Sequence, residues 1–308
     1  MSCPADRTRP LVSSDRPQPP IGSGPSVAAT LVPSWDRRWA VDAVELDRPS
    51  TARLHDALLG GDYHFGVDRR LATRLAATVP GLTRALYAER YFLDRAIRLC
   101  LGEGIRQFLD LGCGLPTVGN ARAVIHRRAP TARVGCVDLD PVVIATLAGD
   151  LIDEDRAAII RADIQRPDEV LDHPTTGALL DLDQPVGVLA VNVLHLIDQP
   201  GTVVGRLMQR LAGGSVLVAS HLTAEHRPRE IATLVELVAP IGIAWVPRSR
   251  TEVQALFTGL TLAEPGLVDP AGWRPDVDEP LPGPGEGFIL AGIGRTTPDR
   301  HPCRRDRA

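Results

Sequence analysis

The order of apolar and polar positions changes near residue 104, and this change divides the expected fold into two parts. Before it, apolar residues recur at helical spacing. After it, short apolar runs alternate with helical stretches. The pattern therefore predicts an N-terminal helical segment over 47–104 and a core over 105–295. The three helices expected in the first part are 50–59, with Ser50 as its cap and Gly60-Gly61 ending it, 67–78 and 82–101.

The core pattern predicts a parallel sheet. Its continuous apolar runs are separated by predicted helices, which indicates strands covered on both faces. Two later strands lie close together in the sequence, so one of them can be antiparallel. The expected strands are 107–111, 133–138, 157–161, 186–191, 215–220, 260–262 and 287–293, and the helices between the first five start near 118, 141, 167 and 202.

The two ends of the chain differ from this body. Residues 1–46 are rich in Pro, Ser and Arg, and we expect them to be mostly disordered, with a short helix possible from Ser34 to Leu46. Residues 296–308 are predicted to form a flexible tail. The apolar residues of 231–238 fit a core-facing helix or a homodimer face, so the pattern leaves the oligomeric state open.

Composition narrows the possible functions. The chain has 308 residues, of which 44% are hydrophobic and 23% charged, and its net charge of −4 does not suggest a nucleic-acid binder. All 34 basic residues are arginines, which excludes chemistry that needs a catalytic or phosphate-binding lysine. The odd number of cysteines, five, argues against a disulfide framework, and they lack zinc spacing, so we expect a cytoplasmic protein without a metal. The apolar runs are too short for a transmembrane helix, and we expect no signal peptide.

A glycine-rich turn after the first predicted strand is the clearest chemical motif. Strand 107–111 runs directly into Gly112-Cys113-Gly114, which is followed by a helix. Glycines allow a sharp turn and a close approach of the backbone to a ligand at the carboxyl end of the sheet. A tight turn without any ligand would also use glycine, so this motif indicates a ligand site only in combination with nearby polar residues.

Acidic residues lie at or near the carboxyl ends of the first three predicted strands. Asp110 lies two residues before the first glycine, a position that is usually apolar in nicotinamide-binding motifs. Asp138 ends the second strand, where a carboxylate can accept both hydroxyl protons of a ribose, while Asp140 is better explained as a helix cap. Asp163, followed by Ile164, could accept a hydrogen bond from an adenine amino group or could be an ordinary loop aspartate.

This ordered set resembles the class I S-adenosylmethionine-dependent methyltransferases. The chain resembles a family of such predicted enzymes from high-GC bacteria, whose substrates are generally unassigned, and the resemblance spans about 47–295. One departure is Glu89, where the family pattern has an asparagine. The matching stretches are 48–53, 58–61 with Phe65, Asp68 and Arg69, 107–112, 115–117 with Gly119 and Asn120, 137–141, 193–195, 214–215, 220–221, 265–268 and 273–276.

The resemblance implies a Rossmann-like fold of seven strands, the last antiparallel, with the N-terminal helices as a partial lid over S-adenosylmethionine. It implies a cofactor site made by Asp110, Gly112, Gly114, Asp138, Asp163, Ile164 and Asn192. Gly60 and Gly61 would approach the ligand or simply end their helix. Arg53, Arg69 and Arg90 are candidates for binding an acidic group or for surface ion pairs.

The implied activity is methyl transfer to an O or N atom of a small molecule. A proton-bearing acceptor can require a base, and His195 and His221, at the ends of two predicted strands, are the candidates; either could equally be a structural histidine. A non-catalytic S-adenosylmethionine sensor or partner-binding protein is the alternative. A nicotinamide-dependent oxidoreductase is disfavoured by Asp110 and by the imperfect glycine spacing.

Overall fold

A seven-stranded sheet forms the centre of the molecule in a computed structural model that describes residues 45, 47–152, 154–277 and 286–297. The predictions for the N-terminal 44 residues and for the tail beyond residue 297 lie outside these ranges. The strand order is β3-β2-β1-β4-β5-β7-β6. The strands are β1 (Gln107–Leu111), β2 (Arg133–Asp138), β3 (Ala157–Arg161), β4 (Gly187–Ala190), β5 (Val216–Leu222), β6 (Thr261–Leu262) and β7 (Ile289–Arg295).

Strand β7 is the antiparallel one, as the resemblance implied. It pairs with β5 from Val216 opposite Arg295 to Leu222 opposite Ile289, and with β6 on its other side. Strands β1 to β5 are parallel to one another. The predicted class I methyltransferase fold is therefore confirmed, and the parallel strands all present their carboxyl ends at one edge of the sheet.

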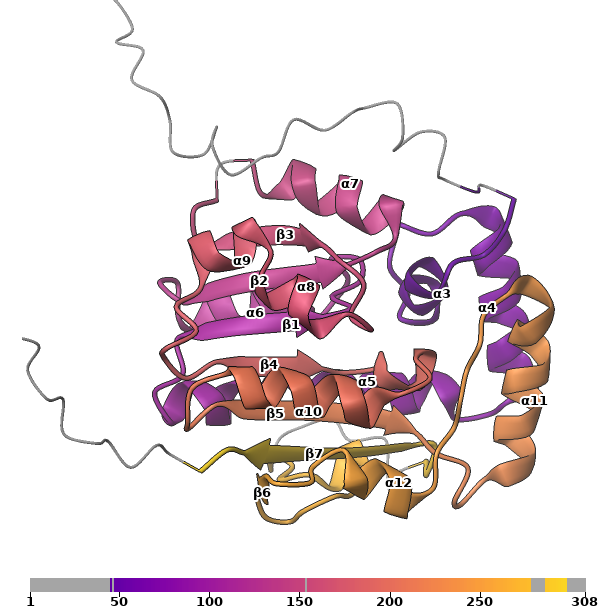
Figure 1. Ribbon diagram of the computed structural model, residues 1–308. Coiled ribbons are helices and arrows are strands. Elements are labelled where there is room, and N and C mark those ends of the chain that lie inside the picture. Colours follow the sequence, from indigo (N-terminus) through magenta and orange to yellow (C-terminus); the bar gives the residue numbers. More distant parts are fainter. Residues whose placement is uncertain (1–44, 46, 153, 278–285, 298–308) are drawn as a thin grey trace, which may run out of the picture.

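Both faces of the sheet are covered, which explains the continuous apolar strands. Leu109 and Leu111 of β1 enter one buried cluster, whereas Phe108 between them enters the cluster on the opposite face. Figure 1 shows helices on both faces of the sheet. The helices that follow the N-terminal segment are α6 (Ala121–Arg128), α7 (Pro141–Asp150), α8 (Pro167–Leu171), α9 (Pro174–Leu179), α10 (Pro200–Arg210), α11 (Pro228–Val238) and α12 (Arg250–Ala255).

The N-terminal helices are α3 (Thr51–Leu58), α4 (Gly66–Thr78) and α5 (Leu82–Gly102). In Figure 1, α3, α4 and α11 gather at the end toward which the parallel strands point. They share a third apolar cluster, which includes Leu54, Leu75, Leu234 and Phe288. This part of the molecule therefore has its own core beside the carboxyl edge of the sheet.

A buried ion pair joins α3 to α4. The Nε atom of Arg53 donates to Asp68 Oδ2 at 2.9 Å, and both side chains are almost completely buried. The Asp68 carboxylate also accepts the backbone N–H groups of Ser50 and Phe65. A buried carboxylate with three donors is well compensated, so Asp68 fixes the start of both helices.

Several predicted boundaries differ from the structure. Helix α6 begins at Ala121 instead of near 118, because Asn120 caps it by accepting from the Ala123 N–H. The helix expected from Pro167 is split into α8 and α9, since Pro174 starts a new helix. Strand β5 extends to Leu222 because β7 pairs with its whole length.

Candidate functional site

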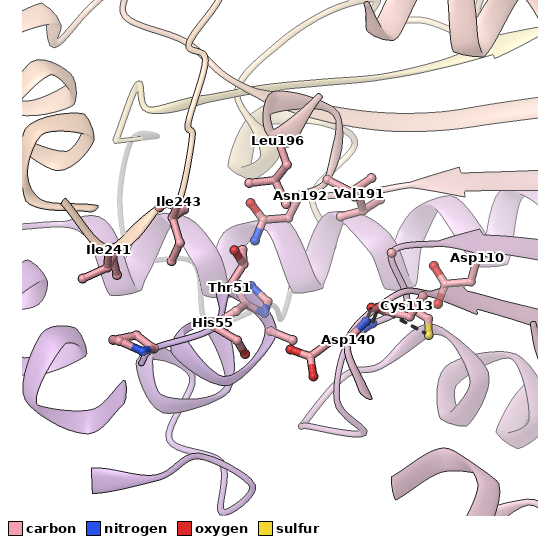
Figure 2. Close-up of a pocket in the computed structure, with 18 of the residues that line it drawn as sticks. Thr51, His55, Asp110, Cys113, Asp140, Val191, Asn192, Leu196, Ile241 and Ile243 are labelled. Carbon is pink, nitrogen blue, oxygen red and sulfur yellow. Dashed lines mark hydrogen bonds between the residues drawn. The ribbon is translucent and has the colours of Figure 1, made fainter. Parts of the chain in front are cut away.

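A cleft of about 390 Å³ lies at the carboxyl ends of β1, β2 and β4. Helix α3 closes one side of it with Thr51 and His55, which Figure 2 shows projecting toward Asn192 and Asp140. Residues 241–243 add a further wall after α11. Among the residues predicted for the cofactor site, the lining contains Asp110, Gly112, Gly114, Asp138 and Asn192.

The glycine turn gives the cleft a backbone wall. Gly112 has φ +62° and Gly114 has φ +66°, the left-handed region in which side chains other than glycine are strained. A β-carbon at Gly112 would overlap the Val193 side chain, whereas a β-carbon at Gly114 would meet open space. Gly112 is therefore needed for packing, and Gly114 leaves room on the side of the cleft.

Asp138 holds this turn against the end of β2. Its Oδ2 accepts the Gly114 N–H at 2.9 Å, and its Oδ1 accepts the N–H groups of Leu139 and Asp140 at 2.8 and 2.9 Å. Burial raises the pKa of Asp138, and these backbone hydrogen bonds oppose the rise. The carboxylate thus lines the cleft in a fixed orientation and retains lone pairs for a ligand.

Asp110 and Arg90 supply opposite charges to the same cleft. Burial raises the pKa of Asp110 to about 7, and the Asp138 carboxylate adds to the rise while Arg90 opposes it. Burial lowers the pKa of Arg90, against the effects of Glu89 and Asp110. A cationic group of a ligand beside Asp110 would stabilise its ionised form. The other arginine candidates differ, since Arg53 is held by Asp68 and the exposed Arg69 lies outside the lining.

A buried hydrogen-bond chain supports Asn192. This residue has φ +59°, which is strained for a residue other than glycine. Its N–H donates to Ser220 Oγ at 2.8 Å, and the Ser220 hydroxyl donates to Glu89 Oε1. Glu89, the departure from the family pattern, therefore lies behind the cleft wall. Burial raises its pKa to about 7, against the Ser220 hydrogen bond and Arg90.

The two candidate histidines occupy different environments. His221 uses both ring nitrogens: Nδ1 lies 2.7 Å from the Leu222 carbonyl oxygen, and Nε2 lies 3.0 Å from Nη1 of Arg248. His195 is 4% exposed, and its Nδ1 is buried with no hydrogen-bond partner among the described residues. The two rings are edge-to-face with centroids 6.1 Å apart.

Burial is the main cause of a lowered pKa in both histidines. Burial, together with His221 and Arg248, lowers the pKa of His195 to about 3. It lowers the pKa of His221 to about 4, although the Leu222 carbonyl opposes this change. Both rings are therefore neutral at pH 7, and only His195 has a ring nitrogen identified as buried and unpaired.

Four residues of the predicted cofactor set do not line the cleft. Asp163 Oδ1 accepts the Gln165 N–H at 2.9 Å within its own turn, and Ile164 is buried in the apolar core. Gly60 has φ +71°, and the N–H groups of Gly60 and Gly61 donate to carbonyls of α3. These contacts are those of a loop aspartate and a helix C-terminus, the alternatives that the sequence left open.

The structure also adds residues that sequence reasoning did not single out. His55 lies one turn after Thr51 on α3, and its Nδ1 lies 3.2 Å from Nη2 of Arg90. Ile241 and Ile243 come from a segment more than 180 residues away from α3 in the sequence. The only sequence feature that could have indicated His55 is the matching stretch 48–53, which ends two residues before it. No local motif indicates Ile241 or Ile243.

Within the described ranges, no cluster of three or more His, Cys, Asp or Glu side chains is arranged to hold a metal ion. No helix there has the length and apolar character required to cross a bilayer.

Comparisons with known proteins agree with this geometry. A structure from Thermobifida fusca, described as a candidate methyltransferase, is 34% identical and has a TM-score of 0.77, covering 86% of this chain and 100% of that one. A protein of the DUF574 family from Streptomyces avermitilis is 31% identical with a TM-score of 0.77, covering 82% of this chain and 100% of its own.

Curated relatives match over a shorter region. Trans-aconitate 2-methyltransferase of Escherichia coli is 34% identical over 107 residues, which are 30% of this chain and 40% of that enzyme. The chain thus spans less than half of the length of these relatives. The model of the S-adenosyl methyltransferase family, in contrast, matches residues 37–297. The chain therefore belongs to the S-adenosyl methyltransferase family and is an S-adenosylmethionine-dependent methyltransferase.

Proposed function

We propose that this enzyme methylates an oxygen or nitrogen atom of a small molecule, with S-adenosylmethionine bound in the cleft at the carboxyl ends of β1, β2 and β4. The observation that carries the proposal is the meeting of Asp110, the Gly112–Gly114 turn, Asp138 and Asn192 at one cavity. Family membership selects S-adenosylmethionine over the nicotinamide alternative. The donor set also fits this cofactor, which presents ribose hydroxyls, an ammonium and a carboxylate.

In this proposal each residue has a stated task. Asp138 accepts the ribose hydroxyls, and the open space at Gly114 admits the ligand to the backbone. Asp110 and Arg90 pair with the ammonium and the carboxylate of the methionine part. Four contacts predicted from the sequence do not line the cleft, and they could reach the cofactor only if the loops that carry them moved. These residues are Asp163, Ile164, Gly60 and Gly61.

When bound, the cofactor supplies an electrophilic methyl group on a sulfonium, so the protein must chiefly position the acceptor and exclude water. Helix α3 covers the cleft and acts as part of the N-terminal lid. Of the two histidines, His195 is the better candidate to accept a proton from the acceptor, since its buried Nδ1 has no hydrogen-bond partner in the described part of the chain. His221 is better suited to orient Arg248, whose guanidinium also donates to the carbonyls of Ile197 and Asp198.

Calorimetric titration of S-adenosylmethionine and S-adenosylhomocysteine tests the cofactor assignment. We expect a dissociation constant near 1 µM, about −8 kcal/mol, for the wild type. In Asp138→Ala the affinity should fall roughly 10- to 100-fold, because charge-assisted hydrogen bonds contribute about 1.5–3 kcal/mol. Absence of binding to folded wild-type protein would contradict the assignment, and an unchanged affinity in Asp138→Ala would contradict the role of this carboxylate.

A further inference from the structure

A second cavity adjoins the cofactor cleft, and we call it the acceptor chamber. It has a volume of about 30 Å³ and shares Thr51, His55 and Asn192 with the cleft. The chamber is therefore a small extension behind α3. Its remaining lining residues come from α3, α5, β5, β7 and the adjoining loops, and they are Leu54, Leu58, Leu82, Leu86, His195, Leu222, Trp245, Phe288 and Ile289.

We propose that the acceptor chamber binds the reacting end of a neutral, planar acceptor, such as the hydroxyl-bearing edge of a phenol-like ring. This inference rests on the proposed methyl transfer and names the class of its substrate. The small volume admits only one narrow end of a molecule, and the chamber adjoins the cofactor cleft at the residues that line both. The shared residues Thr51, His55 and Asn192 mark the place where acceptor and cofactor would meet.

Three buried polar atoms that have no hydrogen-bond partner among the described residues point to a polar group on the ligand. They are His55 Nε2, His195 Nδ1 and Trp245 Nε1, and all three residues line the chamber. An unsatisfied buried donor or acceptor costs about 1–3 kcal/mol, so such atoms rarely gather without a function. A ligand that forms hydrogen bonds with them would remove this cost.

The type of hydrogen bond can be derived for two of these atoms. The indole Nε1–H of Trp245 can only donate. A guanidinium nitrogen can only donate, so His55 Nδ1 is the acceptor in its hydrogen bond with Arg90 Nη2. Burial, aided by Arg90 and His195, holds the pKa of His55 well below its usual range. The neutral His55 ring therefore carries its hydrogen on Nε2. Two donors thus belong to residues that line the chamber, and the ligand should present an accepting oxygen or nitrogen.

The electrostatics of the chamber favour a neutral ligand. None of the described residues that line it is an Arg, Asp or Glu. The guanidinium of Arg90, which donates to His55 Nδ1, is assigned above to the cofactor carboxylate, and that of Arg248 is held by His221 and backbone carbonyls. A carboxylate buried here would lose its hydration without gaining a cation. The chamber is therefore a poor match for a polyanionic acceptor.

Aromatic side chains explain the preference for a planar group. The rings of His195 and Trp245 pack edge-to-face, with centroids 5.8 Å apart and planes at 82°. Phe288 and the leucines complete an apolar wall. Ring faces and edges of this kind interact well with another aromatic ring.

Fluorine NMR with two matched probes tests the proposal. We would titrate 4-fluorophenol and 4-fluorobenzoate into full-length protein, with and without S-adenosylhomocysteine. We expect millimolar binding of 4-fluorophenol and at least tenfold weaker binding of 4-fluorobenzoate. Trp245→Phe should weaken phenol binding several-fold, because it removes one donor and keeps an aromatic ring. Equal or tighter binding of the anion, or no binding of either probe, would overturn the proposal, and the latter result would identify an ordinary hydrated cavity.

A substitution that fills the acceptor chamber tests whether 4-fluorophenol binds there. Leu86→Phe should reduce 4-fluorophenol binding at least tenfold, whereas Leu237→Phe, on the same apolar cluster outside the chamber, should leave it unchanged. Equal binding by Leu86→Phe with retained fold would overturn the assignment; if that variant fails to fold, Trp245→Phe and the probe pair decide. Calorimetry on the same samples separates the two proposals: failure to bind S-adenosylhomocysteine contradicts the cofactor site, whereas failure to bind 4-fluorophenol contradicts only the chamber.

Discussion

The two walls of the cleft are built in opposite ways. On the sheet side, Asp110, Gly112, Gly114 and Asp138 come from two short stretches, and the acids carry the charge. On the opposite side, where α3 separates the cleft from the acceptor chamber, His55, His195 and Trp245 come from distant segments, and burial keeps both histidines neutral. The difference teaches that a charged cofactor is served by local motifs at strand ends, while the space beside it depends on how distant helices and loops pack together.

The largest expected effect comes from detaching the helical wall. Asp68→Ala should lower the free energy of unfolding by about 3–5 kcal/mol, because it leaves the buried Arg53 guanidinium without its carboxylate. Urea denaturation monitored by circular dichroism measures this change. The double variant Arg53→Leu with Asp68→Leu should recover part of the loss, since no uncompensated charge remains. If Asp68→Ala costs less than about 1 kcal/mol, the pair does not anchor α3.

The sheet wall can be tested at its two glycines. Gly112→Ala should cost roughly 2–4 kcal/mol of stability, because it adds overlap with Val193 to left-handed strain. Gly114→Ala has the matched φ but open space, and it should cost only about 1–2 kcal/mol while weakening binding of S-adenosylhomocysteine. Thermal unfolding and calorimetry on both variants measure this contrast. Equal destabilisation by the two changes would contradict it.

A smaller effect on stability should depend on pH, and it comes from Glu89 behind the cleft wall. The pKa of Glu89 is raised to about 7 by burial, so the folded protein retains a proton that the unfolded chain releases above its ordinary pKa. This contribution to stability is complete at low pH and is lost as pH rises through 7. Relative to Glu89→Gln, the wild type should lose roughly 2 kcal/mol between pH 5 and pH 8.

Denaturation of both proteins at each pH measures this difference. The comparison is needed because Asp110, whose raised pKa acts in the same direction, and His195 and His221, whose lowered pKa values act in the opposite one, also titrate. These groups are present in both the wild type and Glu89→Gln, so their contributions to stability cancel to first order in the difference between the two proteins. A difference that does not change with pH would show that Glu89 holds no such proton.

The smallest effect is expected at Asp163. Its side chain accepts a hydrogen bond within its own turn and does not line the cleft. Asp163→Ala should therefore change the affinity for S-adenosylhomocysteine less than about fivefold, in contrast to Asp138→Ala. Calorimetry on the two variants makes the comparison, and a loss above tenfold at Asp163 would restore the adenine contact that the sequence suggested.

Much of the sheet was predictable because its strands are continuous apolar runs. The predicted bounds of β1, β2 and β3 match the structure, since each run is ended by polar or glycine residues. Boundaries that depend on caps or proline, such as the start of α6 at Ala121 and the break at Pro174, were less predictable. Their positions follow from single hydrogen bonds and steric exclusions that periodicity does not record.

Local sequence patterns were enough to predict the sheet, the glycine turn and the acids at the ends of β1 and β2, because these features depend on neighbours in the chain. Only the folded arrangement shows that His221 is engaged by Arg248, while His195 Nδ1 has no partner among the residues that the structure describes. The folded arrangement also decided that His55 and Trp245, 190 positions apart, line one chamber. The physical reason is that partners, burial and therefore pKa are set by packing between distant segments, which short-range patterns do not encode.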